Sequence, residues 1–513
     1  MNFLAFYFLA KLYLYFRGYI GFRVLPNAAV LVAALAIGRR PSPRWRRILN
    51  AALCIAAFLV LWRDAYLPPL GASLGFMADS ATRPTISYVF SFLAGYWNGF
   101  EVFVLAALFL ACAWSGRHGL RLEFLAAALM FVPAVNTSRE RAYSQKAASL
   151  ESAFYSAESG RIVRFAAPPV RDRPFDVVII HVCSLSWDDL RVVGLEKDPF
   201  FSEFDVLLMR FNTATSYSNP AAIRLLRAPC GQTSEGDLFT CDAPAGCYLM
   251  EDLKAAGFKP YSVFNHDGIY SHFKDEVVKW GRAAPPSNPG KLPIEEINFD
   301  GSPIYSNYAA LAAWWAARQS SGEPRAALYY NTVSLHDGAS AVADKSRASG
   351  GRVKKYRGFA RTLFADLRRF FSMIESSGRD ALVIFVPEHG AALEGSRIQA
   401  QGLRDIPLPS ITTVPVGLRF ISRGRRFPGQ RRIDDRLSYL ALADILAFSL
   451  RHRPDANHPF PALELAVLPR TPFMSENQFS RVLESENGFL LQRKDKTWSR
   501  LDPIAVQRPK PPP

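Results

Sequence analysis

Residues 381–390 read Ala381-Leu-Val-Ile-Phe-Val-Pro-Glu388-His389-Gly390. This short apolar run, bounded by Pro and Gly, is typical of a buried strand in a parallel sheet. Open α/β sheets hold their ligands just past the carboxyl ends of such strands. A carboxylate and an imidazole at that edge are good ligands for zinc or a similar divalent ion. Taken alone, the pattern is more often an ordinary turn with a hydrogen-bonded histidine.

Two further apolar runs predict strands that end at the same edge. The run from Asp176 ends at Cys183, and the run from Arg325 to Thr332 continues to His336. Each predicted strand therefore brings a residue that can bind a metal or transfer a proton to the carboxyl end of the sheet. Strand and helix patterns alternate over residues 175–466, which predicts a mostly parallel sheet sandwiched by helices.

A hydroxyl-rich segment lies between the second and third of these strands. It reads Phe211-Asn-Thr-Ala-Thr-Ser-Tyr217-Ser218-Asn219-Pro220 and precedes a predicted helix. Pro220 suits the first helical position, because its missing N–H costs nothing there, and this puts Ser218 or Asn219 near the N-cap. A hydroxyl in the positive field of a helix start can be ionised by a metal and can attack phosphorus. A plain cap on a surface helix would give the same pattern.

Composition and charge favour some classes of partner over others. The net charge is +16, but Lys and Arg are dispersed and do not alternate with aromatic residues as in proteins that stack on nucleic acids. We therefore expect no nucleic-acid partner. The charge fits an anionic membrane surface or anionic substrates. A chain of 513 residues exceeds one typical domain.

The first 136 residues differ from the rest because they contain a series of apolar stretches. Each stretch is short against the ~20 residues of a standard membrane span. A series flanked by Tyr, Trp and Arg nevertheless predicts a transmembrane region with about five helices. The stretches fall near residues 3–16, 24–38, 48–62, 102–115 and 122–135.

Arginine-rich connections indicate the orientation of these helices. The connections between the second and third stretches and between the fourth and fifth are basic, so we expect both in the cytoplasm and everything after about residue 136 outside. Arg17 and Arg23 would lie on the outer side, against this trend. An interfacial helix is expected around residues 86–97.

The remaining boundaries follow from composition. Residues 137–174 are polar and read as a linker, within which residues 138–156 could form a helix that rises from the membrane. Residues 175–505 form the expected outer catalytic domain, and the proline-rich residues 506–513 a disordered tail. Within the domain we expect a helix at residues 437–450, capped by Asp434 or Asp435, and a terminal hairpin at residues 488–500 that turns at Lys494-Asp495-Lys496.

The cysteines divide by location. Two of the six lie in the apolar stretches and read as apolar filler. If Cys183 binds a metal, Cys230, Cys241 and Cys247 remain in the outer domain, where disulfides can form. A bridge between Cys230 and Cys247 is preferred because it closes the loop after the predicted helix at Ser218. A bridge between Cys230 and Cys241 is the alternative, and the sequence leaves the choice open.

Together these segments resemble the alkaline phosphatase superfamily, in its membrane-anchored phosphoethanolamine transferase branch, and in particular the members that modify bacterial cellulose. The motifs occur in the family's order over residues 175–420, and the N-terminal region has a similar layout. They are Cys183-Ser-Leu-Ser-Trp187, Ala214-Thr-Ser-Tyr-Ser218, Cys230-Gly-Gln-Thr-Ser234, Phe299-Asp-Gly-Ser-Pro303, Leu335-His-Asp-Gly338, Pro387-Glu-His-Gly390 and Gly402-Leu-Arg-Asp-Ile-Pro407.

The resemblance implies an alkaline phosphatase/sulfatase-like fold and a zinc-dependent covalent mechanism. Ser218 matches the nucleophile that accepts phosphoethanolamine. Cys183, Glu388 and His389 match the ligands of Zn²⁺, with Ser218 completing the tetrahedron. A cysteine in place of the more usual acidic ligand separates this branch from the transferases that modify lipid A.

Other matched residues would support the reaction. His336 matches a histidine that handles protons or binds the phosphate, and Tyr217 and Arg404 match residues that line the site. A guanidinium suits phosphate because it meets the oxygens in pairs. His266 matches a family position to which we assign no role, and His181, outside the pattern, is interpreted as a structural strand residue.

The resemblance also implies the substrates and the location. The donor would be phosphatidylethanolamine and the acceptor the 6-hydroxyl of glucosyl units in cellulose. The chain would sit in the bacterial inner membrane beside cellulose synthase subunits, with its catalytic domain in the periplasm. One alternative is a phosphatase or sulfatase, although Ser218-Asn-Pro-Ala-Ala lacks the arginine of the sulfatase motif. The other is a non-catalytic scaffold of the synthase, which an intact set of site residues argues against.

Overall fold

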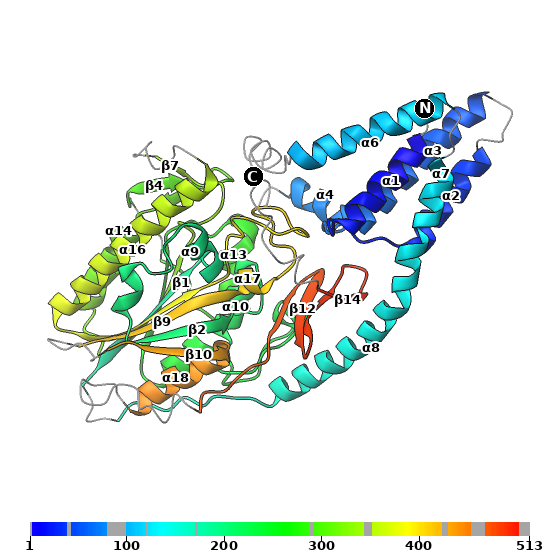
Figure 1. Cartoon of the computed structure of the whole chain (residues 1–513). Coiled ribbons are helices and arrows are strands. Elements are labelled where there is room, and N and C mark those ends of the chain that lie inside the picture. Colours follow the sequence, from blue (N-terminus) through cyan, green and yellow to red (C-terminus); the bar gives the residue numbers. More distant parts are fainter. Residues whose placement is uncertain are drawn as a thin grey trace.

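The computed structural model of the chain has two parts, an N-terminal group of helices and a larger α/β domain (Figure 1). The residues that the structure describes are 3–37, 43–79, 99–118, 122–169, 173–287, 291–342, 351–422, 429–452 and 467–501. The interfacial helix expected around residues 86–97 and the tail at residues 506–513 lie outside them.

A seven-stranded sheet forms the centre of the α/β domain. β9 runs antiparallel to both of its neighbours, whereas the other pairings in the described part of the sheet are parallel. The sheet is therefore mixed, with a mostly parallel arrangement interrupted by one reversed strand. In spatial order the strands are β10 (Arg431–Leu437), β2 (Val206–Asn212), β9 (Thr413–Ile421), β8 (Asp380–Pro387), β1 (Phe175–Val182), β6 (Ala326–Thr332) and β3 (Lys259–Phe264).

Helices cover both faces of this sheet, which explains why its central strands are apolar without alternation. In β1, Val177 and Ile179 enter one core and Val178 and Ile180 enter the other. Each large apolar side chain buried in this way contributes roughly 1.5–3 kcal/mol. One core includes α14 (Asn307–Ser320) and α16 (Arg352–Ser377), and the other includes α10 (Ser218–Leu226), α12 (Leu249–Ala255), α13 (Phe273–Lys279) and α18 (Tyr439–Arg451).

Two smaller sheets and several short helices complete the domain. Their strands are β4 (Ile294–Ile297), β5 (Pro303–Tyr305) and β7 (Ser340–Ala341) in one sheet, and β11 (Met474–Asn477), β12 (Ser480–Ser485), β13 (Gly488–Gln492) and β14 (Trp498–Arg500) in the other. The short helices are α9 (Trp187–Val192), α11 (Glu235–Leu238) and α17 (Pro409–Thr412), with 3-10 turns at Pro199–Glu203 and Tyr270–His272.

Local predictions near the C-terminus met different outcomes. The terminal hairpin is confirmed, because β13 and β14 pair around a turn that contains Lys494. The predicted cap of the helix at residues 437–450 is wrong. Ser438 is the N-cap of α18, while Asp434 and Asp435 belong to β10, which pairing with β2 keeps extended up to Leu437.

The predicted apolar stretches of the N-terminal region all fall on helices. Among the described helices, only α6 is both long enough and apolar enough to cross a membrane, while α1 and α2 are apolar but shorter. The fifth stretch is divided between α7 and α8 at Met130. The helices are α1 (Phe3–Phe16), α2 (Val24–Ile37), α3 (Pro43–Asp64), α4 (Leu70–Ala78), α6 (Gly99–Arg117), α7 (Leu122–Leu129) and α8 (Phe131–Ser159).

Helix α8 connects the two parts of the chain (Figure 1). The helix expected at residues 138–156 is contained within it. Ala147 of α8 packs against Leu483, Leu490 and Trp498 of the C-terminal sheet. The long helix is therefore fixed to the α/β domain by apolar contacts near its middle.

Candidate active site

The carboxyl edge of the sheet gathers the first candidate residues. Val182, the last residue of β1, pairs with Pro387, the last residue of β8. The next residues along the chain, Cys183 and Glu388, therefore emerge at the same level, followed by His389. This edge is where the strand pattern placed them.

Ser218 reaches this edge from the start of helix α10. Tyr217 is the N-cap and Ser218 the first helical residue, so Pro220 is the third residue of the helix and not the first, as the sequence suggested. Proline is tolerated throughout the first turn because those N–H groups have no partner within the helix. Asn219 is directed elsewhere, since its amide donates to the carbonyl oxygen of Ser271 at 2.7 Å. Ser218 is thus the hydroxyl that faces the site.

These residues form one compact cluster, which consists of Cys183, Ser218, Glu388 and His389. The Ser218 Oγ atom lies 3.4 Å from the Cys183 Sγ atom and 3.3 Å from the His389 Nε2 atom. The His389 Nε2 atom lies 4.0 Å from the Cys183 Sγ atom and 3.8 Å from the Glu388 Oε2 atom. The donor atoms of Cys183, Glu388 and His389 all lie within 4.8 Å of one another, and the three residues are buried. Sulfur, nitrogen and carboxylate oxygen are the donors that zinc prefers.

The electrostatics of the cluster fit a bound cation. The Oε2 atom of Glu388 is buried and accepts no hydrogen bond from the described residues. Burial, and then the nearby Glu388 charge, raise the pKa of the Cys183 thiol to about 12. Burial also raises the pKa of Glu388 and lowers that of His389 well below its usual range. Two acidic groups in a dry site keep their charges only if a cation lies between them, so the residues present fit a zinc ion.

A series of hydrogen bonds through Asn331 and His266 orients the Glu388 carboxylate. The Asn331 amide donates to the Glu388 Oε1 atom at 2.7 Å, and the Asn331 Oδ1 atom lies 2.9 Å from the His266 Nε2 atom. The Gly268 N–H donates to the His266 Nδ1 atom at 3.1 Å. This pattern requires the proton of His266 to be on Nε2, where it is donated to Asn331. The role that the sequence left open for His266 is thus to hold Asn331.

Asn331 was missed in the sequence, although it is the polar residue that ends the run Ala-Ala-Leu-Tyr-Tyr-Asn in β6. His181 was expected to be structural. It is fully buried in β1, with its Nδ1 atom 3.1 Å from the Tyr329 hydroxyl and 3.5 Å from the Glu388 Oε1 atom. It therefore packs directly behind a candidate metal ligand.

Arg404 lies on the other side of His389. Its Nη1 atom donates to the Ser184 Oγ atom at 3.0 Å and is 3.2 Å from the His389 Nδ1 atom. The backbone of Arg404 is held by the Asn477 amide, which donates to its carbonyl oxygen at 2.9 Å. His389 Nδ1 is also 3.0 Å from the carbonyl oxygen of Gly390, a contact that leaves Nε2 directed at the cluster.

Tyr217 and His336 border the cluster without a hydrogen bond to Ser218 in the described structure. The Tyr217 hydroxyl donates to the Asp405 Oδ1 atom at 2.6 Å. The His336 ring stacks on Phe299, with ring centroids 4.7 Å apart. Burial, and then the Arg404 charge, lower the pKa of His336 to about 4, so its ring is neutral at pH 7.

The structure contains a disulfide between Cys230 and Cys247, the first of the two pairings that the sequence left open. Cys241 is free and exposed. Cys230 lies a few residues beyond the end of α10. The bridge therefore closes the loop that follows the helix of Ser218.

Comparisons with known proteins cover almost the whole chain. Residues 134–498 match the family described as cellulose biosynthesis protein BcsG C-terminal domain, and residues 4–134 match the BcsG N-terminal domain. The chain is 33% identical to the cellulose biosynthesis protein BcsG of Escherichia coli K12 over 97% of its own length and 94% of that protein. It is 32% identical to the Salmonella typhimurium LT2 protein of the same name over the same shares.

Solved structures give weaker similarities. One is the integral membrane lipooligosaccharide phosphoethanolamine transferase A of Neisseria meningitidis, with a TM-score of 0.43 and 12% identity over 91% of this chain and 99% of that one. Another is the periplasmic domain of Escherichia coli EptC in complex with Zn, with a TM-score of 0.44 and 12% identity over 67% of this chain and 100% of that one. The sequence relationships are much stronger, and the chain belongs to the BcsG family of cellulose biosynthesis proteins.

Proposed function

We propose that the chain transfers phosphoethanolamine from phosphatidylethanolamine, through a covalent intermediate on Ser218, to 6-hydroxyls of the glucosyl units of bacterial cellulose. The observation that carries the proposal is the position of the Ser218 hydroxyl, 3.3–3.4 Å from two candidate ligands of a buried metal site. The family of cellulose biosynthesis proteins and the transferase-like motifs around Ser218 support the acceptor and the transferred group.

The cluster supplies the nucleophile. Zinc bound by Cys183, Glu388 and His389, with Ser218 as the fourth ligand, would supply the positive charge that lowers the pKa of the hydroxyl toward neutrality. The start of α10 adds the positive end of the helix dipole at the same point. Asn331 fixes the orientation of the Glu388 carboxylate.

Each half of the reaction exchanges one bond to phosphorus. In the first half a bond forms between the Ser218 oxygen and phosphorus, the bond from phosphorus to the diacylglycerol oxygen breaks, and the proton lost by the Ser218 hydroxyl passes by way of His336 to that oxygen. In the second half the sugar oxygen attacks phosphorus, the bond from phosphorus to the Ser218 oxygen breaks, and the sugar proton passes by way of His336 to the Ser218 oxygen. The His336 ring is neutral at pH 7 and therefore has a free nitrogen lone pair for this proton. The Arg404 guanidinium is suited to hold phosphate oxygens.

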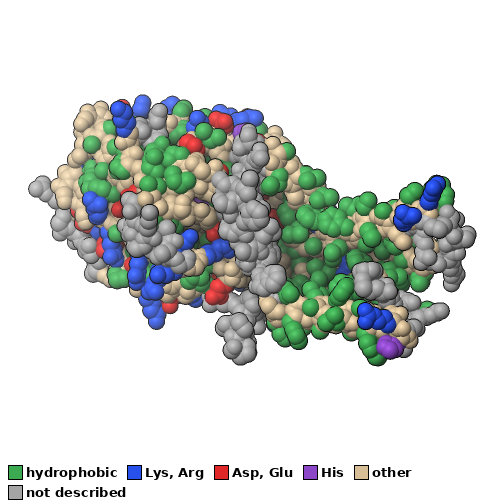
Figure 2. Space-filling view, turned by 90° about the horizontal axis from the view of Figure 1, so that it is seen from above, with side chains coloured by type: hydrophobic (Ala, Val, Ile, Leu, Met, Phe, Trp, Pro, Cys, Tyr) green, Lys and Arg blue, Asp and Glu red, His purple; other side chains and the backbone are tan. Residues whose placement is uncertain are grey.

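The N-terminal helices would anchor the enzyme in the bacterial inner membrane. α6 can span it, and Figure 2 shows apolar side chains spread over the helical part of the surface. Exposed residues there include Leu25, Phe103, Leu110 and Phe124. A lipid environment accounts for such a surface, which would be unfavourable in water. We assign residues 1–136 to a membrane region of about five helices, 137–174 to a linker and 175–505 to a periplasmic domain, next to subunits of the cellulose synthase complex.

The experiment uses the full chain in detergent, phosphatidylethanolamine labelled in the ethanolamine, and soluble cello-oligosaccharides. We expect label on the oligosaccharide together with an equal amount of released diacylglycerol, and neither product from Ser218→Ala. Label released only as free phosphoethanolamine would show a hydrolase. A folded, zinc-loaded chain that releases no diacylglycerol would favour the scaffold.

A further inference from the structure

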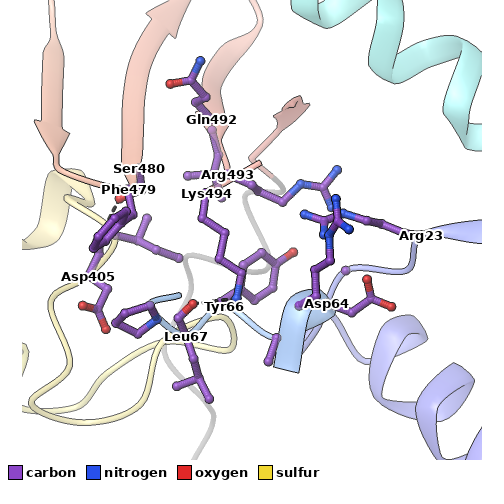
Figure 3. A pocket seen from close by; sticks show the side chains of 16 residues that line it. Arg23, Asp64, Tyr66, Leu67, Asp405, Phe479, Ser480, Gln492, Arg493 and Lys494 are labelled. Atoms are coloured by element: carbon purple, nitrogen blue, oxygen red, sulfur yellow. Dashed lines mark hydrogen bonds between the residues drawn. The ribbon is translucent and has the colours of Figure 1, made fainter. Parts of the chain in front are cut away.

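A pocket lies where the membrane helices meet the catalytic domain (Figure 3). The empty space in and around it, open solvent included, is about 520 Å³. The outer ends of α2 and α3 form one side, with Arg23 and Arg63. The turn between β13 and β14 forms another, with Arg493 and Lys494, and Asp405 lies on a third side.

Positive charge is in excess at one end of this pocket. Of the two acidic residues in the lining, Asp64 already pairs with Lys11 at 2.8 Å inside the helical bundle. Arg23 pairs with Asp495, yet its Nη1 atom is buried and donates no hydrogen bond to the described residues. Burial, and then the Arg23 charge, lower the pKa of Lys494 to about 8. Cations crowded in this way favour a bound anion.

The close approach of these cations is built into the backbone. A Cβ atom at Gly21 would lie 2.6 Å from the Arg493 Nη1 atom, so a larger residue there would require that guanidinium to shift. The Lys494 ammonium donates to the carbonyl oxygens of Trp62 and Leu67, both at 2.8 Å. The basic end of the pocket is thus a formed structure and not a group of mobile surface side chains.

The opposite end of the pocket carries a negative group. Asp405 lies across the pocket from Arg23 and Arg493, with Tyr66 and Lys494 between them (Figure 3). Its Oδ1 atom accepts the Tyr217 hydroxyl, whereas its Oδ2 atom is buried without a hydrogen bond from the described residues. An ammonium group would satisfy that oxygen.

The geometry points to a docking site for the headgroup of a zwitterionic phospholipid, phosphatidylethanolamine, with its phosphate at Arg23, Arg63, Arg493 and Lys494 and its ammonium at Asp405. The inference rests on the proposed function for its donor and for the placement of the pocket at the outer face of the membrane. Arg404, next to Asp405, contacts the candidate ligand His389. A headgroup bound at Asp405 is therefore separated from the cluster at Ser218 by the segment that contains Arg404 and Asp405.

The test is noncovalent lipid binding by native mass spectrometry of the full chain carrying Ser218→Ala. This background forms no adduct on Ser218, so failure of the transfer reaction would not affect the result. We expect the chain to bind phosphatidylethanolamine at least roughly tenfold more tightly than phosphatidylglycerol, which has the phosphate but no ammonium. Asp405→Asn should abolish this preference.

The double variant Arg63→Gln/Arg493→Gln should weaken phosphatidylethanolamine binding by roughly tenfold or more. It leaves in place the contacts of Arg23 and Lys494 that join the two parts of the chain. Arg361→Gln, which removes an exposed arginine of α16, is the matched control and should change nothing. Unchanged lipid binding in the double variant, or equal binding of the two lipids, would overturn the inference. So would binding of soluble phosphoethanolamine without binding of the lipid.

Discussion

Truncation of Asn331 should weaken zinc binding although Asn331 is not itself a candidate ligand. The residue is fully buried, and its amide donates at 2.7 Å to the Glu388 Oε1 atom. In Asn331→Ala this oxygen loses its short hydrogen bond, and the His181 Nδ1 atom remains beside it at 3.5 Å. Loss of such an outer partner typically costs 10–100-fold in metal affinity, which corresponds to about 1.4–2.7 kcal/mol.

The assay is competition for zinc against chelators of graded affinity, with the full chain in detergent and bound metal measured by elemental mass spectrometry. His266→Ala should give a smaller loss, because it acts on Glu388 only through Asn331. Asn307→Ala is the control. Asn307 is also buried and hydrogen-bonded, to Tyr330 and Ser334, but contacts no candidate ligand. Equal zinc affinities of Asn331→Ala and the unaltered chain, or equal losses for Asn331→Ala and Asn307→Ala, would show that Asn331 does not support zinc binding through Glu388.

Three further predictions concern other parts of the α/β domain. Cys183→Ser should lower zinc affinity by more than Asn331→Ala does in the same competition assay, while Cys241→Ser, at a free exposed thiol, should leave it unchanged. Replacing both Cys230 and Cys247 by serine opens a loop of 17 residues and should lower the free energy of unfolding by about 3 kcal/mol, seen as a lower Tm at unchanged zinc content. The folded-state pKa of His336, about 4, is below its ordinary 6.5, so the stability that its neutral ring contributes is present above pH 6.5 and is lost as the pH falls toward 4. Because partial exposure reduces the full linkage effect, His336→Gln should make the loss of unfolding free energy over that window smaller by about 1 kcal/mol, seen as a smaller fall of Tm.

The carboxyl edge was predictable because it depends on local pattern and on one rule of topology. Apolar runs that stop at Cys183 and at Glu388 mark buried strands, and parallel strands in register bring their ends to one level. The helix start around Pro220 pointed to Ser218 or Asn219, and the family resemblance then selected Ser218. The mixed direction of the sheet was not predictable in this way, because an apolar strand such as β9 has the same pattern in either direction.

Features that depend on contacts between distant residues could not be read from the chain. The hydrogen bond from Asn331 to Glu388 joins residues 57 positions apart. The cap of α18 depends on how far β10 stays paired with β2, which no local signal at Asp434 or Asp435 reveals. The basic pocket combines Arg23 with the turn at Lys494, and neither segment suggests the other.

Ser218 is the residue that we propose carries the transferred group. The most direct measurement is the intact mass of the full chain in detergent after incubation with phosphatidylethanolamine and zinc, followed by peptide mapping. We expect one phosphoethanolamine adduct, located on Ser218, that is absent from Ser218→Ala and lost when the metal is chelated beforehand. An adduct on another residue, or turnover of the lipid by Ser218→Ala, would contradict this expectation.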